Sequence, residues 1–226
     1  IGEILGSKPR LVLLNKSDLA DPAVTEKWVR KFSSEQIVAL PIDAASGTGM
    51  KRIAQRVREL MAPKIEVWRK KGIAPRATRV LIVGIPNVGK STLINRLAGR
   101  SAAATGDRPG ITKGQQWIKI GKDMELLDTP GILWPKFEDP EVGLRLAATG
   151  AIRDEIMNPV EIAFYLIVYL SKHYPSVLKE RYQVERLPED LENPHEITEV
   201  LEAVGKRRGA VMSGGKIDWN KSSEML

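Results

Sequence analysis

Short apolar runs alternate with amphipathic stretches along the first 130 residues of the chain. Runs rich in aliphatic residues predict strands at residues 10–14, 36–42, 79–83, 117–120 and 124–127. Helical spacing predicts helices over residues 24–32, 50–71 and 90–97. In the second of these helices the apolar positions share one face: Ile53, Val57, Leu60 and Met61. Because strands alternate with helices, this region is predicted to be an α/β domain with a largely parallel, doubly wound sheet.

The pattern changes after Pro135, where helical spacing dominates and no convincing strand appears until the last residues. Helices are predicted over residues 142–148, 159–173, 176–182 and 196–207. We therefore expect two domains, an α/β domain over 1–134 and a small all-helical domain over 135–226. Residues 72–78, with Pro75, are predicted to be a linker, and the basic, glycine-rich stretch 205–216 a mobile or docking segment.

A glycine-rich loop at residues 84–91 reads G-I-P-N-V-G-K-S and lies between a predicted strand and a predicted helix. This is the P-loop pattern, in which backbone amides and a helix N-terminus surround phosphate groups. Lys90 is expected to bridge the β- and γ-phosphates, and the Ser91 hydroxyl to ligate Mg²⁺. The alternative is a structural glycine turn. The predicted phosphate-binding residues are Asn87, Val88, Gly89, Lys90, Ser91 and Thr92.

A D-x-x-G motif, Asp128 to Gly131, follows a later strand. Its carboxylate is placed to reach Mg²⁺ through water, and the Gly131 amide to sense a γ-phosphate. Thr112, in the intervening stretch G-D-R-P-G-I-T, is predicted to ligate Mg²⁺ and contact the γ-phosphate, with Thr105 as the alternative. D-x-x-G alone is a common turn sequence. Paired with the P-loop, it predicts a triphosphate site in which Lys90, Thr112 and Gly131 act on the γ-phosphate.

Asn15 to Asp18 reads N-K-S-D and follows a predicted strand, the position at which open α/β sheets bind ligands. Two acceptors on Asp18 match the N1–H and N2–H₂ donors of guanine, and adenine lacks that donor pair. Asn15 is expected to support the loop and reach the base, with Lys16 covering the face of the base. Ala44, at the end of the next strand, is expected to donate its amide to guanine O6. Alone, N-K-x-D is often only a helix cap; here it favours a GTP site over an ATPase or a small-molecule kinase.

The guanine-reading motifs precede the P-loop, the reverse of the usual order, which indicates a circular permutation. The chain resembles the circularly permuted GTPases of ribosome assembly, most closely the bacterial ribosome biogenesis GTPase A (YlqF-type) family, over nearly its whole length. That likeness is carried by G-I-P-N-V-G-K-S-T-L-I-N-R at 84–96, T-G-D-R-P-G-I-T at 105–112 and L-L-D-T-P-G-I-L-W-P-K-F-E-D at 126–139. It implies a GTP-hydrolysing switch in late assembly of the large (50S) ribosomal subunit that contacts rRNA. It also implies a further strand and helix ahead of Ile1.

Ile132 stands where ordinary small GTPases have the Gln that orients the attacking water. We therefore expect slow intrinsic hydrolysis that the ribosomal subunit stimulates. The resemblance implies a catalytic His ahead of Ile1, and we assign His173 and His195 to structural or surface roles. It also implies a K⁺ ion at Asn87; the alternative is that Asn87 only shapes the loop. The expected cofactors are thus Mg²⁺ and K⁺.

Positive charge is concentrated in residues 51–79, which hold ten lysines and arginines but two glutamates, in a chain of net charge +7. This imbalance favours a polyanionic partner over a self-neutralising helix face. The chain has no cysteine, which excludes disulfides and a cysteine nucleophile and suits a reducing cytoplasm. The longest apolar run, 162–170, is too short to span a membrane. The expected partners of this cytoplasmic monomer are GTP and GDP, the large ribosomal subunit and its rRNA, and no membrane.

The permuted order joins the γ-phosphate sensor at Gly131 directly to the helical domain. We expect GTP to re-aim that domain and so create a composite RNA-binding surface with the basic helix. Two alternatives stay open: an RNA-binding protein with a relic P-loop, and a GTP-regulated RNA-binding or signalling G protein not tied to the ribosome. The sequence shows no lipidation signal.

Overall fold

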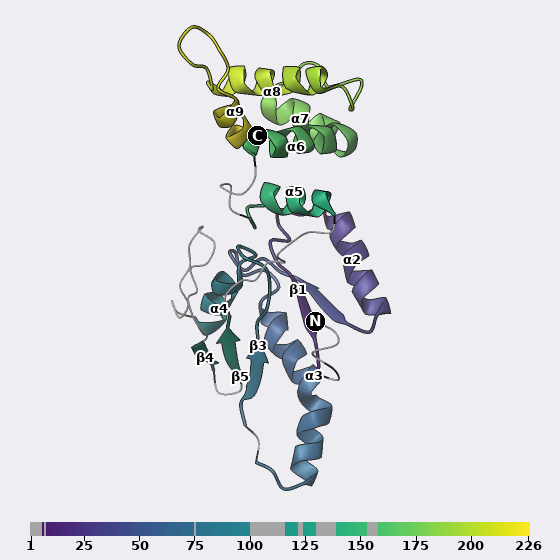
Figure 1. Ribbon diagram of the computed structural model, residues 1–226. Coiled ribbons are helices and arrows are strands. Elements are labelled where there is room, and N and C mark those ends of the chain that lie inside the picture. Colours follow the sequence, from purple (N-terminus) through teal and green to yellow (C-terminus); the bar gives the residue numbers. More distant parts are fainter. Residues whose placement is uncertain are drawn as a thin grey trace. The chain divides into compact units, whose positions relative to one another are not determined.

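The computed structural model describes residues 6, 8–74, 76–99, 116–121, 124–129, 139–152 and 158–226 (Figure 1). The chain divides into two compact units, Ile1–Leu133 (unit 1) and Trp134–Leu226 (unit 2). No helix in the described ranges is long and apolar enough to cross a membrane.

Unit 1 is an α/β unit whose described strands form two sheets. β1 (Leu11–Leu14) pairs in parallel with β2 (Val38–Pro41). β3 (Thr78–Leu81) pairs in parallel with β5 (Met124–Asp128), which also pairs with antiparallel β4 (Gln116–Ile120). All five predicted strands are confirmed, with slightly different ends. The single sheet that we expected is instead divided between β1–β2 and β3–β5–β4, because β1 and β3 do not pair with each other.

Three helices of unit 1 match the predicted ones: α2 (Pro22–Ser34), α3 (Lys51–Lys70) and α4 (Lys90–Ala98). Two apolar clusters form the core, one behind β1 and β2 and one behind β3, β4 and β5. Val57, Ile82 and Leu97 pack against both clusters. Although the sheets are not hydrogen-bonded to each other, shared apolar packing therefore holds them in one unit.

The described elements of unit 2 are helical, apart from one isolated bridge: α5 (Pro140–Ala148), α6 (Pro159–His173), α7 (Pro175–Tyr182), α8 (Pro194–Arg208) and α9 (Trp219–Met225). Proline opens the first four, and its fixed φ suits that position. Asp139, Asn158 and Asn193 cap α5, α6 and α8 through their side-chain oxygens. The core lies between α6, α7 and α8, and its largest fully buried side chains are Ile167, Leu178, Leu201 and Val204.

Part of the stretch 205–216, which we expected to be a mobile or docking segment, is packed within unit 2. Gly205 belongs to the last turns of α8, where a Cβ would lie 2.2 Å from the Ser222 hydroxyl of α9. Ala210 is fully buried, and Val211 forms an isolated antiparallel bridge with Ile217. Glycine at 205 therefore lets α8 and α9 approach closely, and the stretch connects two packed helices.

Candidate nucleotide-binding site

The P-loop lies between β3 and α4, as predicted. Gly89 adopts φ +90° at the start of α4 and has no side chain with which to cap the helix. A helix N-terminus of this kind presents backbone amides and the positive end of the helix dipole to phosphate. Lys90 folds back over the loop, and its Nζ donates to the carbonyls of Gly84 at 2.9 Å and Ile85 at 2.8 Å. The ammonium group is thus held against the loop that is predicted to hold the phosphates.

Asn15 connects the two motifs that are far apart in the sequence. Its Nδ2 donates to the carbonyl of Val88 at 2.7 Å, and its Oδ1 accepts from the amide of Ala44 at 3.0 Å. A Cβ at Gly89 would lie 2.4 Å from Asn15 Nδ2, so only glycine allows this close approach. The N-K-x-D motif at the end of β1 therefore contacts both the P-loop and the loop that follows β2.

Asp18 and Lys16 are exposed beyond the end of β1. Lys16 has φ +57°, a left-handed conformation that turns the chain sharply after the strand. The Ser17 amide donates to the carbonyl of Ile42 at 3.1 Å, which ties this turn to the end of β2. The Asp18 carboxylate forms no hydrogen bond or ion pair with the described residues. Its two oxygens are accordingly available to donors from outside the chain.

The loop after β2 is tied to the N-K-x-D motif. The Ala44 amide, which we assigned to guanine O6, donates in this structure to Asn15. The buried Asp43 carboxylate accepts from the amides of Ala45 at 2.8 Å and Ser46 at 3.1 Å. A hydrogen bond from the Ser46 side chain lowers the pKa of Asp43, and the two backbone amides act in the same direction. Asp43 thus organises the loop, a role that its Asx-turn sequence could have suggested.

Arg96, in the last turn of α4, is a second residue that the motifs did not reveal. Its Nε donates to the carbonyl of Ala44 at 3.3 Å, and another guanidinium nitrogen donates to the carbonyl of Ala45. The helix that begins at the P-loop therefore ends on the loop that follows β2. Residue 96 lies 52 positions from Ala44, and no local pattern announces this contact.

The predicted Mg²⁺ ligands are only partly described. Ser91 lies in the first turn of α4. The β3–β5 register pairs Leu81 with Leu127, so the backbone of Asp128 ends beside Ile82 at the start of the P-loop. Thr129 reinforces this junction, because its hydroxyl donates to the carbonyl of Ile82 at 2.6 Å. Five predicted groups fall outside the described residues: Thr105, Thr112, Gly131, Ile132 and the side chain of Asp128.

The remaining predicted residues have clear local positions. Asn87 has φ +54°, a conformation that asparagine tolerates better than most residues and that contributes to the shape of the loop. Thr92 is exposed on α4. The His173 ring lies against Tyr169 in a tilted arrangement with centroids 4.6 Å apart, whereas exposed His195 lies 3.5 Å from Glu199. Among the described residues, no cluster of three or more His, Cys, Asp or Glu side chains is suited to hold a metal ion.

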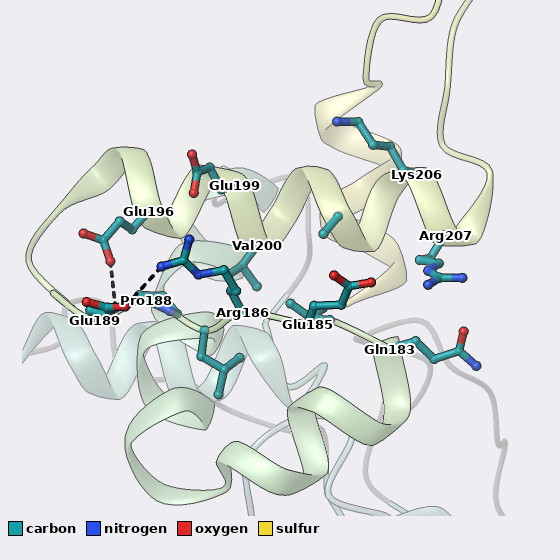
Figure 2. Close-up of a pocket in the computed structure, with 13 residues that line it drawn as sticks. Gln183, Glu185, Arg186, Pro188, Glu189, Glu196, Glu199, Val200, Lys206 and Arg207 are labelled. Atoms are coloured by element: carbon teal, nitrogen blue, oxygen red, sulfur yellow. Dashed lines mark hydrogen bonds and ion pairs between the residues drawn. The ribbon is translucent and has the colours of Figure 1, made fainter.

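A cavity of about 590 Å³ lies in unit 2, between residues 183–189 and α8 (Figure 2). Its acidic side chains serve the fold: Glu196 accepts from the amides of Glu189 at 2.7 Å and Asp190 at 3.2 Å. These hydrogen bonds lower the pKa of Glu196, with the Asp190 amide as the largest cause. No residue of the nucleotide motifs lines this cavity. It is therefore separate from the predicted GTP site.

Comparison with known proteins points to one family of GTPases. Residues 79–201 match the model of the 50S ribosome-binding GTPase family, just over half of the chain. Ribosome biogenesis GTPase A of Bacillus cereus is 55% identical over 226 residues, covering 100% of this chain and 74% of the relative. The Priestia megaterium protein of the same name is 54% identical over 227 residues, covering 100% of this chain and 77% of its own.

Among solved structures, GNP-bound YlqF from Thermotoga maritima aligns with a TM-score of 0.59 and 26% identity, covering 94% of this chain and 72% of that one. The family match begins at β3, so it includes the P-loop and D-x-x-G, while N-K-x-D lies ahead of it. The predicted fold is confirmed: a P-loop α/β unit in circularly permuted order, followed by helices.

Proposed function

Because the chain belongs to the ribosome biogenesis GTPase A family of circularly permuted GTPases, and is therefore a GTP hydrolase of ribosome biogenesis, we propose that it is a switch in late assembly of the large (50S) ribosomal subunit. The observation that carries the proposal is the pair of hydrogen bonds by which Asn15 joins the guanine-reading and phosphate-binding motifs. In this proposal the protein is a cytoplasmic monomer that contacts rRNA directly.

The base and the phosphates are assigned to opposite sides of Asn15. Asp18 accepts the two guanine donors, because its carboxylate lies exposed at the end of β1 with no partner in the described part of the chain. Lys16 covers the base. The α4 N-terminus and Lys90 hold the phosphates. The amide of Ala44 reaches guanine O6 only if it exchanges its bond to Asn15, so its contact with the base is a nucleotide-bound one.

Mg²⁺ fits the region where β5 and α4 meet. The β3–β5 register brings the Asp128 backbone beside the start of the P-loop, and Ser91 supplies a hydroxyl in the first turn of α4. With Thr112, these residues offer the hard oxygen ligands that Mg²⁺ prefers. Bound there, the ion neutralises charge on the β- and γ-phosphates. We extend the proposal to K⁺ at Asn87, tested below by replacing K⁺ with Na⁺.

Hydrolysis is proposed to be slow until the subunit binds. Ile132 offers no polar atom for the attacking water, so the chain's own contribution is to position the phosphates through Lys90 and Gly131. Subunit binding then completes the catalytic site. GTP hydrolysis therefore occurs only after assembly of the large subunit has reached the stage at which the protein binds.

The α3 region is the proposed rRNA contact in unit 1. This region, residues 51–79, contains two ion pairs. Glu59 pairs with Arg56 at 2.5 Å, and Arg79, at the C-terminal end of the region, pairs with Glu125 at 3.2 Å. The last turns of α3 lie beside the start of β3, at the end of unit 1 away from the P-loop (Figure 1). The eight other cations of this region form no ion pair with described residues: Lys51, Arg52, Arg58, Lys64, Arg69, Lys70, Lys71 and Arg76.

Trp68 shapes the end of this surface. Two cations contact its ring: Lys64 Nζ lies 5.4 Å from the centroid, and the guanidinium carbon of Arg76 lies 5.2 Å from it. These cation–π contacts draw the chain after α3 back toward the helix and gather positive charge around one ring. Phosphate groups of folded rRNA complement such a surface. Unit 2 is proposed to supply a second contact with the ribosome.

The test is co-sedimentation of the full chain with purified large ribosomal subunits, with a non-hydrolysable GTP analogue and with GDP. We expect tight binding only with the analogue. Reversing three charges, Arg69→Glu, Lys70→Glu and Lys71→Glu together, should weaken binding at least tenfold and flatten its salt dependence. Lys27→Glu, Arg30→Glu and Lys31→Glu on α2 form the matched control and should bind as the natural chain does.

Two outcomes would contradict the proposal. Equal loss of binding in both triple variants would mean that net charge alone, rather than the α3 surface, attracts the subunit. No binding to large subunits in any nucleotide state, with GTP still bound, would favour the alternative of a GTP-regulated RNA-binding or signalling protein that is not tied to the ribosome.

A further inference from the structure

We propose that Arg96 is a positioning residue that controls how long a guanine nucleotide stays bound, because it fastens the base-side loop to the P-loop helix. The base-side loop is defined here as residues 43–47. This inference rests on the proposed guanine site, since it requires that the loop lie against the base. It adds a residue that no nucleotide motif includes.

The contact geometry is that of a clamp across the site. Arg96 leaves the last turn of α4 and donates to two successive carbonyls, Ala44 at 3.3 Å through Nε and Ala45 through a terminal nitrogen. A planar guanidinium suits this task, because its N–H groups point in fixed directions and can serve two acceptors at once. The carbonyls of the base-side loop are thereby held in one orientation relative to α4.

The loop backbone also packs directly on the guanidinium. A Cβ at Gly47 would lie 3.3 Å from Arg96 Nε, and Gly47 has φ +95°. The positive charge of Arg96 also contributes, as the smallest cause, to the lowered pKa of Asp43, whose carboxylate folds the same loop. The clamp therefore has hydrogen-bonding, packing and electrostatic parts that act on one short segment.

Both backbone polar groups of Ala44 form hydrogen bonds. Its N–H donates to Asn15, and its carbonyl accepts from Arg96. Asn15 in turn binds the P-loop carbonyl of Val88. If the Ala44 amide turns to the base when nucleotide binds, Arg96 is the contact that still holds the loop in place. Without Arg96 the loop can swing away, which opens the base side of the site while the phosphate side stays formed.

The experiment measures release of a fluorescent GDP analogue from the full chain by stopped-flow chase with excess GDP. Arg96→Ala should accelerate release about tenfold, since it removes two hydrogen bonds to a charged donor. Arg96→Lys keeps the charge and one donor group, so it should fall between Arg96→Ala and the natural chain. Arg30→Ala, which removes an exposed α2 arginine paired with Glu26, is the control and should stay within twofold.

A purely structural role is separated by steady-state kinetics. Arg96→Ala should raise the KM for GTP about as much as it accelerates release, while kcat at saturating GTP changes less than twofold. A general loss of folded protein would instead lower kcat and leave KM unchanged. If Arg96→Ala does not fold, the intermediate rate of Arg96→Lys and a further variant, Arg96→Gln, test the same prediction.

The proposal is overturned if Arg96→Ala and Arg96→Lys both release nucleotide within twofold of the natural chain. The base-preference test of Asp18→Asn, described below, distinguishes this failure from a wrong guanine site. If Asp18→Asn changes the preference from GTP to XTP while the Arg96 variants release nucleotide at the natural rate, only the role of Arg96 is overturned. If Asp18→Asn does not change the base preference, the guanine site on which that role rests is overturned.

Discussion

Different interactions stabilise the nucleotide-binding loops of unit 1 and the helices of unit 2. In unit 1, polar contacts between distant loops position the site: Asn15 with Val88 and Ala44, and Arg96 with Ala44 and Ala45. In unit 2, aliphatic side chains of three helices pack in a continuous buried core. A change in the first region should therefore alter nucleotide binding, and a change in the second should alter the free energy of unfolding.

This difference has a functional reason. A GTP switch must rearrange its loops between nucleotide states, and hydrogen bonds between loops can be exchanged for bonds to a ligand. A buried apolar core has no such alternative partners and resists rearrangement. The core of unit 2 is accordingly suited to keep its shape, and the loops of unit 1 are suited to respond to GTP.

Asp18→Asn tests the nucleotide-binding loops of unit 1 and should produce the largest change in nucleotide affinity. An amide in place of the carboxylate leaves one guanine donor facing another donor, so GTP affinity should fall about a thousandfold. Xanthine carries a carbonyl where guanine carries its amino group, so XTP affinity should rise. Competition of GTP, XTP and ATP against fluorescent GDP measures all three affinities.

Asp21→Asn is the matched control, because Asp21 caps α2 three residues further on and asparagine caps a helix equally well. It should leave the base preference unchanged. If Asp18→Asn still prefers GTP over XTP by the natural margin, another residue reads the base.

Gly89→Ala should have the next largest effect. Its Cβ would meet Asn15 Nδ2 at 2.4 Å, and φ +90° is unfavourable for alanine. We expect GTP affinity to fall about thirtyfold, as the Asn15 contacts are broken, with a cost of roughly 1–3 kcal/mol in the unfolding free energy of unit 1. Isothermal titration of GDP and urea unfolding measure the two effects.

Gly99→Ala provides the comparison at the other end of α4. Gly99 also has a positive φ, +65°, but apart from its own helix and its chain neighbours no atom of the described residues lies within 4 Å of a Cβ there. Gly99→Ala should therefore lower the unfolding free energy through backbone strain, as Gly89→Ala does, but should leave the affinity for GTP unchanged. Equal affinity losses in both variants would mean that the Asn15 contact does not shape the nucleotide site.

Gly205→Ala tests the packing of the helices of unit 2. In an open helix this change stabilises by about 1 kcal/mol. Here the Cβ would lie 2.2 Å from the Ser222 hydroxyl and 3.2 Å from its Cβ, so the sign should reverse, with a loss of about 1–3 kcal/mol in unit 2. Urea unfolding of the variant and of the natural chain measures the difference. GDP affinity serves as the internal control and should not change.

Adding Ser222→Gly should recover part of the lost stability, because it removes both atoms that clash. Stability that rises in Gly205→Ala would show that α8 and α9 are not closely packed at this point.

Glu196→Gln should have the smallest effect, and it depends on pH. Hydrogen bonds lower the folded-state pKa of Glu196 below its unfolded-state value, so the ionised form stabilises unit 2. That contribution is present above the unfolded-state pKa and is lost as the pH falls through the folded-state pKa. The natural chain and Glu196→Gln should therefore differ in urea midpoint at pH 7, and the difference should disappear as the pH falls through the folded-state pKa of Glu196. Glu185→Gln, which removes an exposed carboxylate with no ion pair in the described part of unit 2, should match the natural chain throughout; a constant difference across pH for Glu196→Gln would contradict the assignment.

The strands and helices were predictable because periodicity reports burial along a local segment. α9 escaped prediction, since W-N-K-S-S-E-M shows no clear apolar face. The approach of the guanine-reading motif to the P-loop was also predictable, because both motifs follow strands of one fold. Arg96 was not identified, because its role depends on a contact that forms only after folding, across the 52 residues that separate it from Ala44. Asp43 was missed although its hydrogen bonds to the amides of Ala45 and Ser46 are local and typical of an Asx turn.

The split sheet teaches a related point. Each strand was recognisable by itself, whereas pairing between β1 and β3 had to be assumed from the fold class. Strand pairing is a property of the whole unit, and a local pattern specifies the strand without its neighbour.

Steady-state GTP hydrolysis by the full-length protein, with and without purified large ribosomal subunits and in K⁺ or Na⁺ buffer, tests the central claim most directly. The account predicts slow hydrolysis alone, at least tenfold stimulation by large subunits, and greater stimulation in K⁺ than in Na⁺. The same slow rate with and without subunits, at saturating GTP in K⁺, would contradict the proposal that the large subunit completes the active site.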